Sequence, residues 1–213
     1  MRLPIMPLNS VLYPWMPIVL TIFEERYLRM LAEVLRGPRF FGTALIAEGK
    51  EVGGPAVPHP VGVEVMIARA WPAEAGSWRV IGIGRHRFRI LGPLSQEPYP
   101  CAETDYAGLQ ESDDAPASLV HRVRELFSEH LQLLARLLNP TAASMEIPTE
   151  PSRLSYMVAA HLGVDLTVRQ RLLEIVTARE RLQVEADLLK ADIAKFRLFV
   201  KGVPSDPDKA KRN

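Results

Sequence analysis

The sequence predicts an α+β protein, in which a small, partly closed β-barrel with one crossover helix precedes a helical bundle. Three observations lead to this class. Up to about Tyr106, Pro and Gly break the chain into short segments rich in Val, Ile, Phe and Trp. From about Ala117 onward, apolar residues recur at helical spacing and glycine becomes rare. The acidic, proline-containing stretch 110–116 lies between the two halves and is typical of a linker.

Prolines and glycines divide the first half into short elements. Four prolines between positions 4 and 17 exclude a long helix and a central strand, which leaves short extended pieces at 2–8 and 17–21. Apolar residues at three-to-four spacing predict a helix over 24–36, which Gly37-Pro38 ends. The further segments expected as strands are 40–47, 61–71, 78–91 and 101–106.

The second half is helical in period. Residues 118–139 form the first expected helix, which Asn139-Pro140 ends, and a short helix over 152–162 is closed by Gly163. Thr167–Gln170 has the form of a capping box and predicts the start of a final helix over 168–201, about 50 Å long at about 1.5 Å per residue. Its apolar positions form a coiled-coil-like seam, interrupted only by Arg179: Leu172, Ile175, Leu182, Ala186, Leu189, Ile193, Phe196 and Val200.

This pattern predicts four parts: a β domain over 1–109, a linker over 110–117, a helical bundle over 118–202 and a disordered polar tail over 203–213. The later part of the seam, 182–200, needs a partner for its apolar face. Two alternatives remain open: it packs on its own chain, or it pairs with a second copy.

The bulk composition is that of a soluble globular protein with a sizeable core. Of 213 residues, 47% are hydrophobic and 24% are charged, and the formal net charge is +1. A balance this close to neutral creates no global field that would favour nucleic acid or a membrane surface. The longest early apolar run, 17–23, is too short to cross a bilayer and lacks the basic flank of a leader peptide. We therefore expect a cytoplasmic protein that does not associate with a membrane.

Several kinds of chemical site are excluded by the residues present. The single Cys101 cannot form an intramolecular disulfide, and its apolar surroundings favour a buried structural thiol. The five histidines show no HExxH pattern or close metal-ligand spacing. Gly49-Lys50 is followed by Glu51, so no phosphate-binding loop of the GKS or GKT type is present. We expect no metal, no cofactor and no enzymatic activity.

The opening run, LPIMPLNSVLYPWMPIVLTIFEERY from Leu3 to Tyr27, closely resembles the start of the Lon protease N-terminal domain family. The resemblance covers roughly residues 1–201. Its further motifs recur in the family's order, in the first half as Phe41-Gly42, Leu45-Ile46, Glu51-Val52-Gly53, Val61-Gly62 and Gly84–Ile90, and in the second as 159–162, 169–175 and 178–182.

This resemblance implies a fold and a function. The fold is a PUA-like β-barrel followed by a helical bundle that ends in a long helix. The function is substrate recognition without catalysis, by a free-standing member that lacks the ATPase and peptidase modules. Unfolded or damaged polypeptides would be the ligands, in protein quality control, with a protease or chaperone as a further partner.

An apolar groove is the surface expected to hold such polypeptides. Its candidate residues are Trp15, Met16, Trp71 and Trp78, because sequence-tolerant binding depends mainly on burial of apolar area. Trp15 stands where the resembled family usually has Gly, and its ring should either cover the barrel end or be exposed as a contact. Thr21 replaces a His that often precedes the IFEER segment.

An alternative function is RNA binding by the PUA-like domain. Arg85, Arg87 and Arg89 alternate along one expected strand, with His86, Phe88 and Ile90 on its other face. Such an arginine row is either a solvated outer face or a surface for acidic peptide or phosphate. The near-neutral net charge places nucleic acid below polypeptide as a partner.

Overall fold

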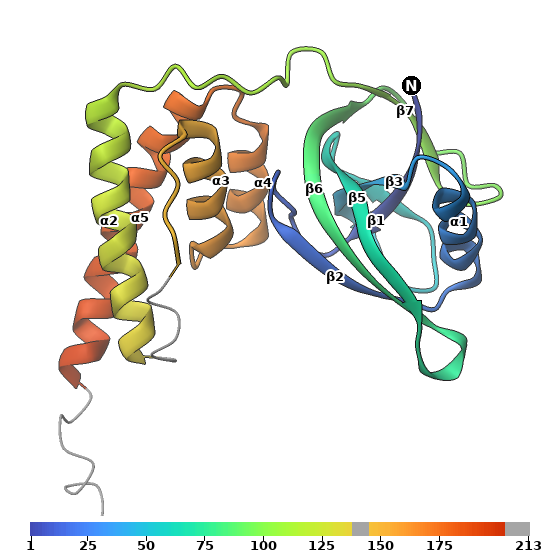
Figure 1. The fold of residues 1–213 in the computed structure, drawn as a ribbon, viewed down its shortest axis with the longest axis horizontal. Helices are drawn as coiled ribbons and strands as arrows, with labels where there is room; N and C mark the ends of the chain where they lie inside the picture. The colour runs from blue at the N-terminus through green and yellow to red at the C-terminus, as the bar shows by residue number, and fades with distance from the viewer. Residues whose placement is uncertain (138–144, 203–213) are drawn as a thin grey trace, which may run out of the picture. The chain divides into compact units, whose positions relative to one another are not determined.

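The computed structural model describes residues 1–137 and 145–202 and divides the chain into two compact units (Figure 1). The β unit consists of Met1–Glu111 and Val164–Val176, and the helical unit of Ser112–Gly163 and Thr177–Asn213. The predicted tail over 203–213 and the last residues of the predicted helix 118–139 lie outside the described residues.

The β unit is a closed barrel with a crossover helix, which confirms the predicted fold class. Five strands form the ring in the order β1-β7-β6-β5-β3, and β1 closes it by pairing with β3 in parallel. Strands β4 and β2 extend it from β3 and β6, and α1 connects β2 to β3. The bounds are β1 Arg2–Leu8, β2 Pro17–Ile22, α1 Glu25–Arg36, β3 Phe40–Gly49, β4 Ala56–Pro58, β5 Val61–Pro72, β6 Trp78–Ile90, β7 Cys101–Asp105 and α4 Leu166–Glu174.

Fully buried side chains from several strands stabilise the barrel. Ile5, Phe41, Val63, Val65 and Phe88 are completely shielded from solvent. Each burial contributes about 1.5–3 kcal/mol relative to an exposed side chain. The thiol of Cys101 is also buried, which raises its pKa and agrees with the predicted structural role.

The turn before β2 packs tightly against β6. The Gly84 N–H donates to the Met16 carbonyl at 2.9 Å, and the Trp15 N–H donates to the Gly84 carbonyl at 2.8 Å. A Cβ atom at position 84 would lie 2.4 Å from the Tyr13 carbonyl oxygen, so only glycine fits there.

Trp15 itself has a φ of 63°, a left-handed conformation that glycine adopts most readily. This φ explains why the resembled family usually has glycine at this position. Of the two alternatives for the ring, the structure favours exposure, at 38%.

Trp15→Gly is expected to change the free energy of unfolding of the β unit by less than about 1 kcal/mol. Relief of the left-handed strain is offset by the greater freedom of glycine in the unfolded chain and by the loss of ring contacts. Urea unfolding followed by the emission of Trp71 and Trp78 measures the difference. A loss of more than about 2 kcal/mol would show that the ring is a necessary part of the core.

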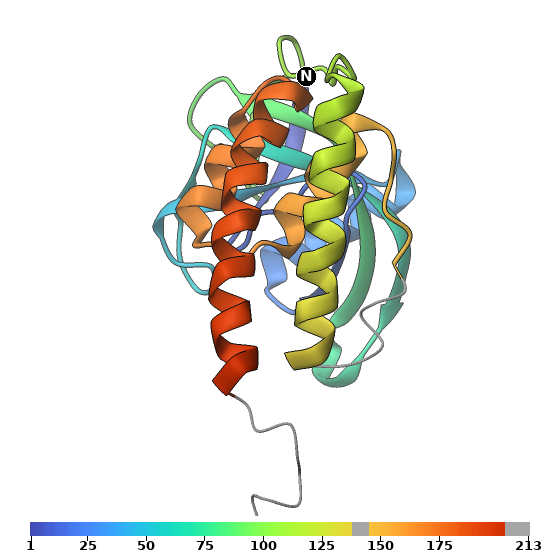
Figure 2. The ribbon, with the colours of Figure 1, turned by 90° about the vertical axis from the view of Figure 1, so that its left-hand side faces the viewer.

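Within residues 112–137, 145–163 and 177–202, the helical unit forms three helices, α2 Ala117–Leu137, α3 Pro151–His161 and α5 Ala178–Gly202. Helices α2 and α5 lie side by side along most of their length (Figure 2), and α3 contacts both. The seam residues of α5 are buried in this unit: Leu182, Ala186, Leu189 and Ile193. Of the two alternatives for the seam, packing on its own chain therefore holds as far as Ile193.

The prediction of one continuous helix over 168–201 is wrong. Helix α4 ends at Glu174, the next residue is extended with φ −60° and ψ 125°, and α5 begins at Ala178.

Helix α4 belongs to the β unit, although the sequence prediction placed it in the bundle. The Tyr13 hydroxyl donates to the Arg169 carbonyl at 2.9 Å, and the Gln170 side-chain amide donates to the Val61 carbonyl at 3.0 Å. The cap of α4 is Asp165, whose carboxylate accepts the Val168 N–H at 2.8 Å, and not the predicted Thr167.

Candidate functional site

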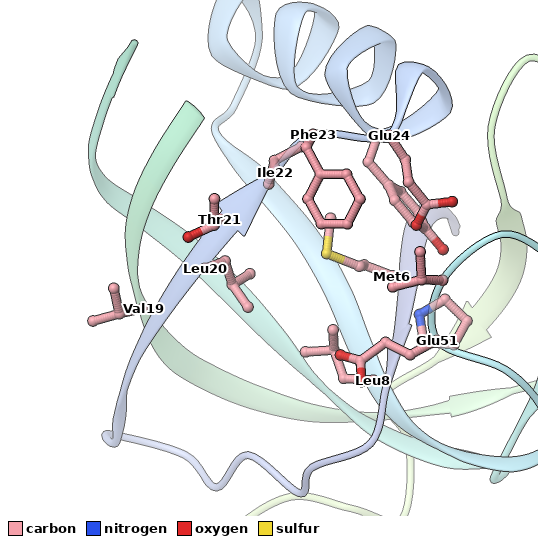
Figure 3. A pocket seen from close by; sticks show the side chains of 12 residues that line it. Met6, Leu8, Val19, Leu20, Thr21, Ile22, Phe23, Glu24 and Glu51 are labelled. Carbon is pink, nitrogen blue, oxygen red and sulfur yellow. The ribbon is translucent and has the colours of Figure 1, made fainter. Parts of the chain in front are cut away.

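A pocket of about 170 Å³ opens beside β2 in the β unit (Figure 3). Strand β2 forms one wall, and the end of β1, the start of α1 and the loop after β3 form the others. Most of the lining is apolar, as with Met6, Leu8 and Leu20, and two carboxylates, Glu24 and Glu51, also contribute. No Lys, Arg or His side chain belongs to the lining that the structure describes.

Strand β2 presents an open edge at this pocket. Among the described residues it pairs only with β6, antiparallel, in a register that places Ile18 opposite Gly82. The Gly84 N–H bonds to the Met16 carbonyl, so the even-numbered residues of β2 face β6 with their hydrogen-bonding groups. The N–H and C=O groups of Val19 and Thr21 therefore point away from β6. Pro17 occupies the same kind of position, where its missing N–H costs no sheet hydrogen bond.

Large apolar side chains remain exposed around this edge. Val19 is 59% exposed, Phe23 55% and Val52 53%, and all three line the pocket. Single exposed apolar residues are common, but a group of them around one pocket is typical of a binding surface. An open strand edge with apolar surface beside it is also the structural requirement for binding an extended peptide as an added strand.

The two carboxylates of the pocket differ in their partners. Glu24 forms an ion pair with Arg26, with an Nη2–Oε2 distance of 3.0 Å, and accepts the Gly53 N–H at 3.2 Å. For Glu51, which is half-buried, the described residues provide no hydrogen bond or ion pair. In Figure 3 its carboxylate is directed across the pocket toward Leu8. Burial raises the pKa of Tyr27, and the nearby charges of Glu24 and Glu51 raise it further, against the opposing effect of Arg26.

The four residues predicted for the peptide groove do not come together, and none of them lines this pocket. Trp15 and Met16 precede β2, whereas Trp78 is paired with Ile22 at the other end of the strand and Trp71 lies in the same hairpin. Six residues of strand separate the two pairs by about 20 Å.

The sequence interpretation missed Val19, Phe23 and Glu51. The signal for the first two was present, because an apolar strand that begins with proline is typical of an edge strand.

The arginine row predicted on β6 is not an exposed face. Arg87 is 1% exposed, Arg85 is half-buried, and Arg89 is exposed. Arg87 and Arg89 lie on one face, paired with Val63 and Val61, and Arg87 is buried because Leu109 and residues 173–176 cover it. A bulge in β6 separates Arg85 from that face, because Val63 pairs with Arg87 while Val65 pairs with Gly84, so strict alternation is lost. His86, expected on the inner face, is exposed for the same reason.

Arg87 instead serves the structure of the β unit. Its guanidinium donates to the carbonyls of Leu173, Ile175 and Val176 at 2.9, 2.6 and 2.9 Å, and to that of Leu109 at 3.2 Å. Its Nε lies 2.9 Å from the Glu111 carboxylate. The nearby Arg85 is 3.5 Å from Glu64 and lies over the Phe40 ring, 4.6 Å from its centroid. Two of the three arginines are thus committed to partners within the β unit.

Residues 1–137 and 145–202 contain no group of three or more His, Cys, Asp or Glu side chains placed to hold a metal ion. Over the same residues, no helix is long and apolar enough to span a membrane.

The fold defines the class of the protein as α+β, built from a closed barrel with an open-edged strand and a helical unit. The chain belongs to the ATP-dependent protease La (LON) substrate-binding domain family, which matches residues 2–191. This match confirms the family resemblance found in the sequence.

Full-length relatives and solved domains both match. The chain is 28% identical over 204 residues to a Lon protease of Solibacter usitatus, covering 92% of this chain and 25% of that protein. It is 29% identical over 193 residues to a Lon protease of Methylocella silvestris, covering 88% and 24%. The chain thus spans about a quarter of the length of these relatives.

Among solved structures, a Lon N-terminal domain protein from Xanthomonas campestris matches with a TM-score of 0.68 and 25% identity, covering 86% of this chain and 95% of that one. The N-terminal domain of a Mycobacterium avium complex Lon protease matches with a TM-score of 0.67, covering 89% and 98%. At 18% identity, the second likeness concerns the fold alone.

Proposed function

We propose that the protein binds extended or unfolded segments of other polypeptides and performs no catalysis itself. The observation that carries this proposal is the open edge of β2 beside an apolar pocket. Backbone hydrogen bonds to a strand edge are available to any peptide, because every residue except proline has the same N–H and C=O groups. Such binding tolerates many sequences, as recognition of unfolded clients requires.

The family supports the same function. The match is to a substrate-binding domain, and the relatives are Lon proteases in which the matched region is about a quarter of the protein. We infer that this module acts in protein quality control, where it holds damaged chains for a protease or a chaperone. The proposal that it is not an enzyme is supported by a match confined to the substrate-binding domain.

Val19→Pro tests the site directly. This change removes the N–H that points to the open edge but leaves the hydrogen bonds of Ile18 and Leu20 to β6 in place. We expect the wild type to bind a fluorescently labelled, reduced and alkylated protein with a Kd of roughly 1–50 µM, measured by fluorescence anisotropy. The affinity of Val19→Pro should be at least about 10-fold lower, because one backbone hydrogen bond is lost and the adjacent pair is disturbed.

Val19→Thr is the matched control, since it keeps the N–H and the β-branched shape. Its affinity should stay within about 3-fold of the wild type. Circular dichroism establishes that both variants are folded. Equal affinities of folded Val19→Pro and wild type would show that peptides do not bind along this edge, and absence of saturable binding to the wild type would refute the proposed function.

A further inference from the structure

Glu51 is the feature of the pocket that the general binding of unfolded chains does not explain. It lies in the loop after β3, half-buried, and contributes a carboxylate to a lining that is otherwise mostly apolar. A carboxylate beside apolar surface has lost part of its hydration, which is unfavourable unless another group compensates. The described residues provide no hydrogen-bond donor or cation for it.

The other charges near the pocket are already compensated. Glu24 is held by the Arg26 guanidinium and by the Gly53 N–H. Arg26 in turn donates to the Gly54 carbonyl at 3.0 Å and lies over the Tyr27 ring, 4.6 Å from its centroid. Glu51 therefore remains as the group that can interact with a charged ligand.

The size of the pocket indicates what kind of ligand group fits. About 170 Å³ is smaller than the 300–1,000 Å³ typical of sites for small molecules, but several times the volume of one water. One long side chain of a bound peptide fits this space. Side chains alternate along an added strand, so every second one would face the same side as the pocket.

We propose that the pocket selects extended segments that carry a Lys or Arg side chain between apolar residues. This inference rests on the proposed function. The aliphatic stem of the basic side chain packs against Leu8 and Leu20, and its cationic group pairs with Glu51. Long basic side chains combine these two properties, whereas an apolar side chain leaves the carboxylate without a partner and an acidic one is repelled by it.

The experiment compares three versions of one unstructured, fluorescently labelled peptide. They differ only at the central position, which is Lys, norleucine or Glu, so the stem length of the first two is nearly matched. With the wild type we expect the Lys peptide to bind at least about 5-fold more tightly than the norleucine peptide, and the Glu peptide to bind most weakly. The preference for Lys should decrease as salt is raised.

Glu51→Gln should remove the difference between the Lys and norleucine peptides, because the Lys peptide loses the charge that favours it and the norleucine peptide no longer leaves a carboxylate without a partner. Glu74→Gln is the matched control, because it makes the same change of charge at an exposed position of the β5–β6 hairpin and should keep the preference.

The outcomes separate this inference from the function on which it rests. Equal binding of the Lys and norleucine peptides to the wild type would overturn the selection of basic residues and leave the peptide-binding function intact. A preference for Lys that survives in Glu51→Gln would overturn the role of Glu51. If none of the three peptides binds the wild type, both the inference and the proposed function fail.

Discussion

Arg87→Ala is expected to destabilise the β unit by about 3–5 kcal/mol. The guanidinium is buried and donates to four backbone carbonyls. One belongs to Leu173 in the last turn of α4, two to Ile175 and Val176 directly after the helix, and one to Leu109. Its removal leaves these carbonyls without a donor in a place that water reaches poorly, and it leaves the Glu111 carboxylate without its cation. We expect α4 to detach from the barrel as a consequence.

Urea unfolding followed by tryptophan emission measures this effect, because the three tryptophans, Trp15, Trp71 and Trp78, all lie in the β unit. Arg89→Ala is the matched control, since Arg89 is exposed on the same strand and its removal should cost less than about 0.5 kcal/mol. Arg87→Lys should recover only part of the loss, because an ammonium group lacks the planar set of donors that reaches several carbonyls. Equal midpoints for Arg87→Ala and Arg89→Ala would show that α4 is held by its apolar contacts alone.

Glu185→Gln is expected to stabilise the helical unit by about 5 kcal/mol at pH 9 and by only about 1 kcal/mol at pH 5. Glu185 is fully buried on α5 and accepts the Ser155 hydroxyl at 2.9 Å. Burial raises the pKa of its carboxyl to about 8, against the opposing effects of the Arg181 charge and the Ser155 hydrogen bond. Gln has nearly the same shape and still accepts the hydroxyl, but it is never charged.

The direction of the pH effect follows from proton binding. Between the unfolded pKa of Glu, about 4.3, and the folded value of about 8, the folded state binds more protons than the unfolded state. The stability of the wild type therefore falls as pH rises through this window, and Glu185→Gln should not show this fall.

Burial lowers the pKa of His130 in the same unit, so its protonation destabilises the fold as pH falls below about 6.5. Measurements from pH 7 to 9 thus isolate the contribution of Glu185.

Urea unfolding followed by helical circular dichroism is the suitable measurement, with the β unit monitored separately by tryptophan emission. Glu180→Gln is the control on the same helix, because Glu180 is exposed and its difference from the wild type should not change between pH 7 and 9. A wild-type stability that stays constant or rises over this range would contradict the raised pKa.

Local patterns were sufficient to predict the type of nearly every element. The helix expected at 24–36 is α1, Glu25–Arg36, because helical spacing and Gly37-Pro38 are signals contained in the segment itself. The strands at 61–71 and 78–91 are β5 and β6, within one residue at each end. The family, too, was recognisable from the order of short motifs, and the match over 2–191 confirms it.

The final helix shows where local patterns fail. Its seam keeps steps of three and four residues through 172–200, with Arg179 as the one charged position, so the spacing predicts no interruption at 175–177. The interruption is stabilised by Arg87, which is distant in sequence and binds the carbonyls that a continuous helix would have used. The same arginine was assigned to an exposed row because alternation cannot show that Leu109 and residues 173–176 cover this part of β6.

The fold class, the family and most of the elements were thus predictable from the sequence. The signals were the spacing of apolar residues, the Pro and Gly residues that end elements, and the order of short motifs, and each of them spans only a few residues. The candidate site was not predictable from these signals. Its open edge exists because β2 pairs with β6 alone among the described strands. The carboxylate of Glu51 belongs to a loop about 30 residues further along the chain. Only the tertiary structure decides which backbone groups stay unpaired and which distant side chains meet, because both depend on long-range packing that no local pattern encodes.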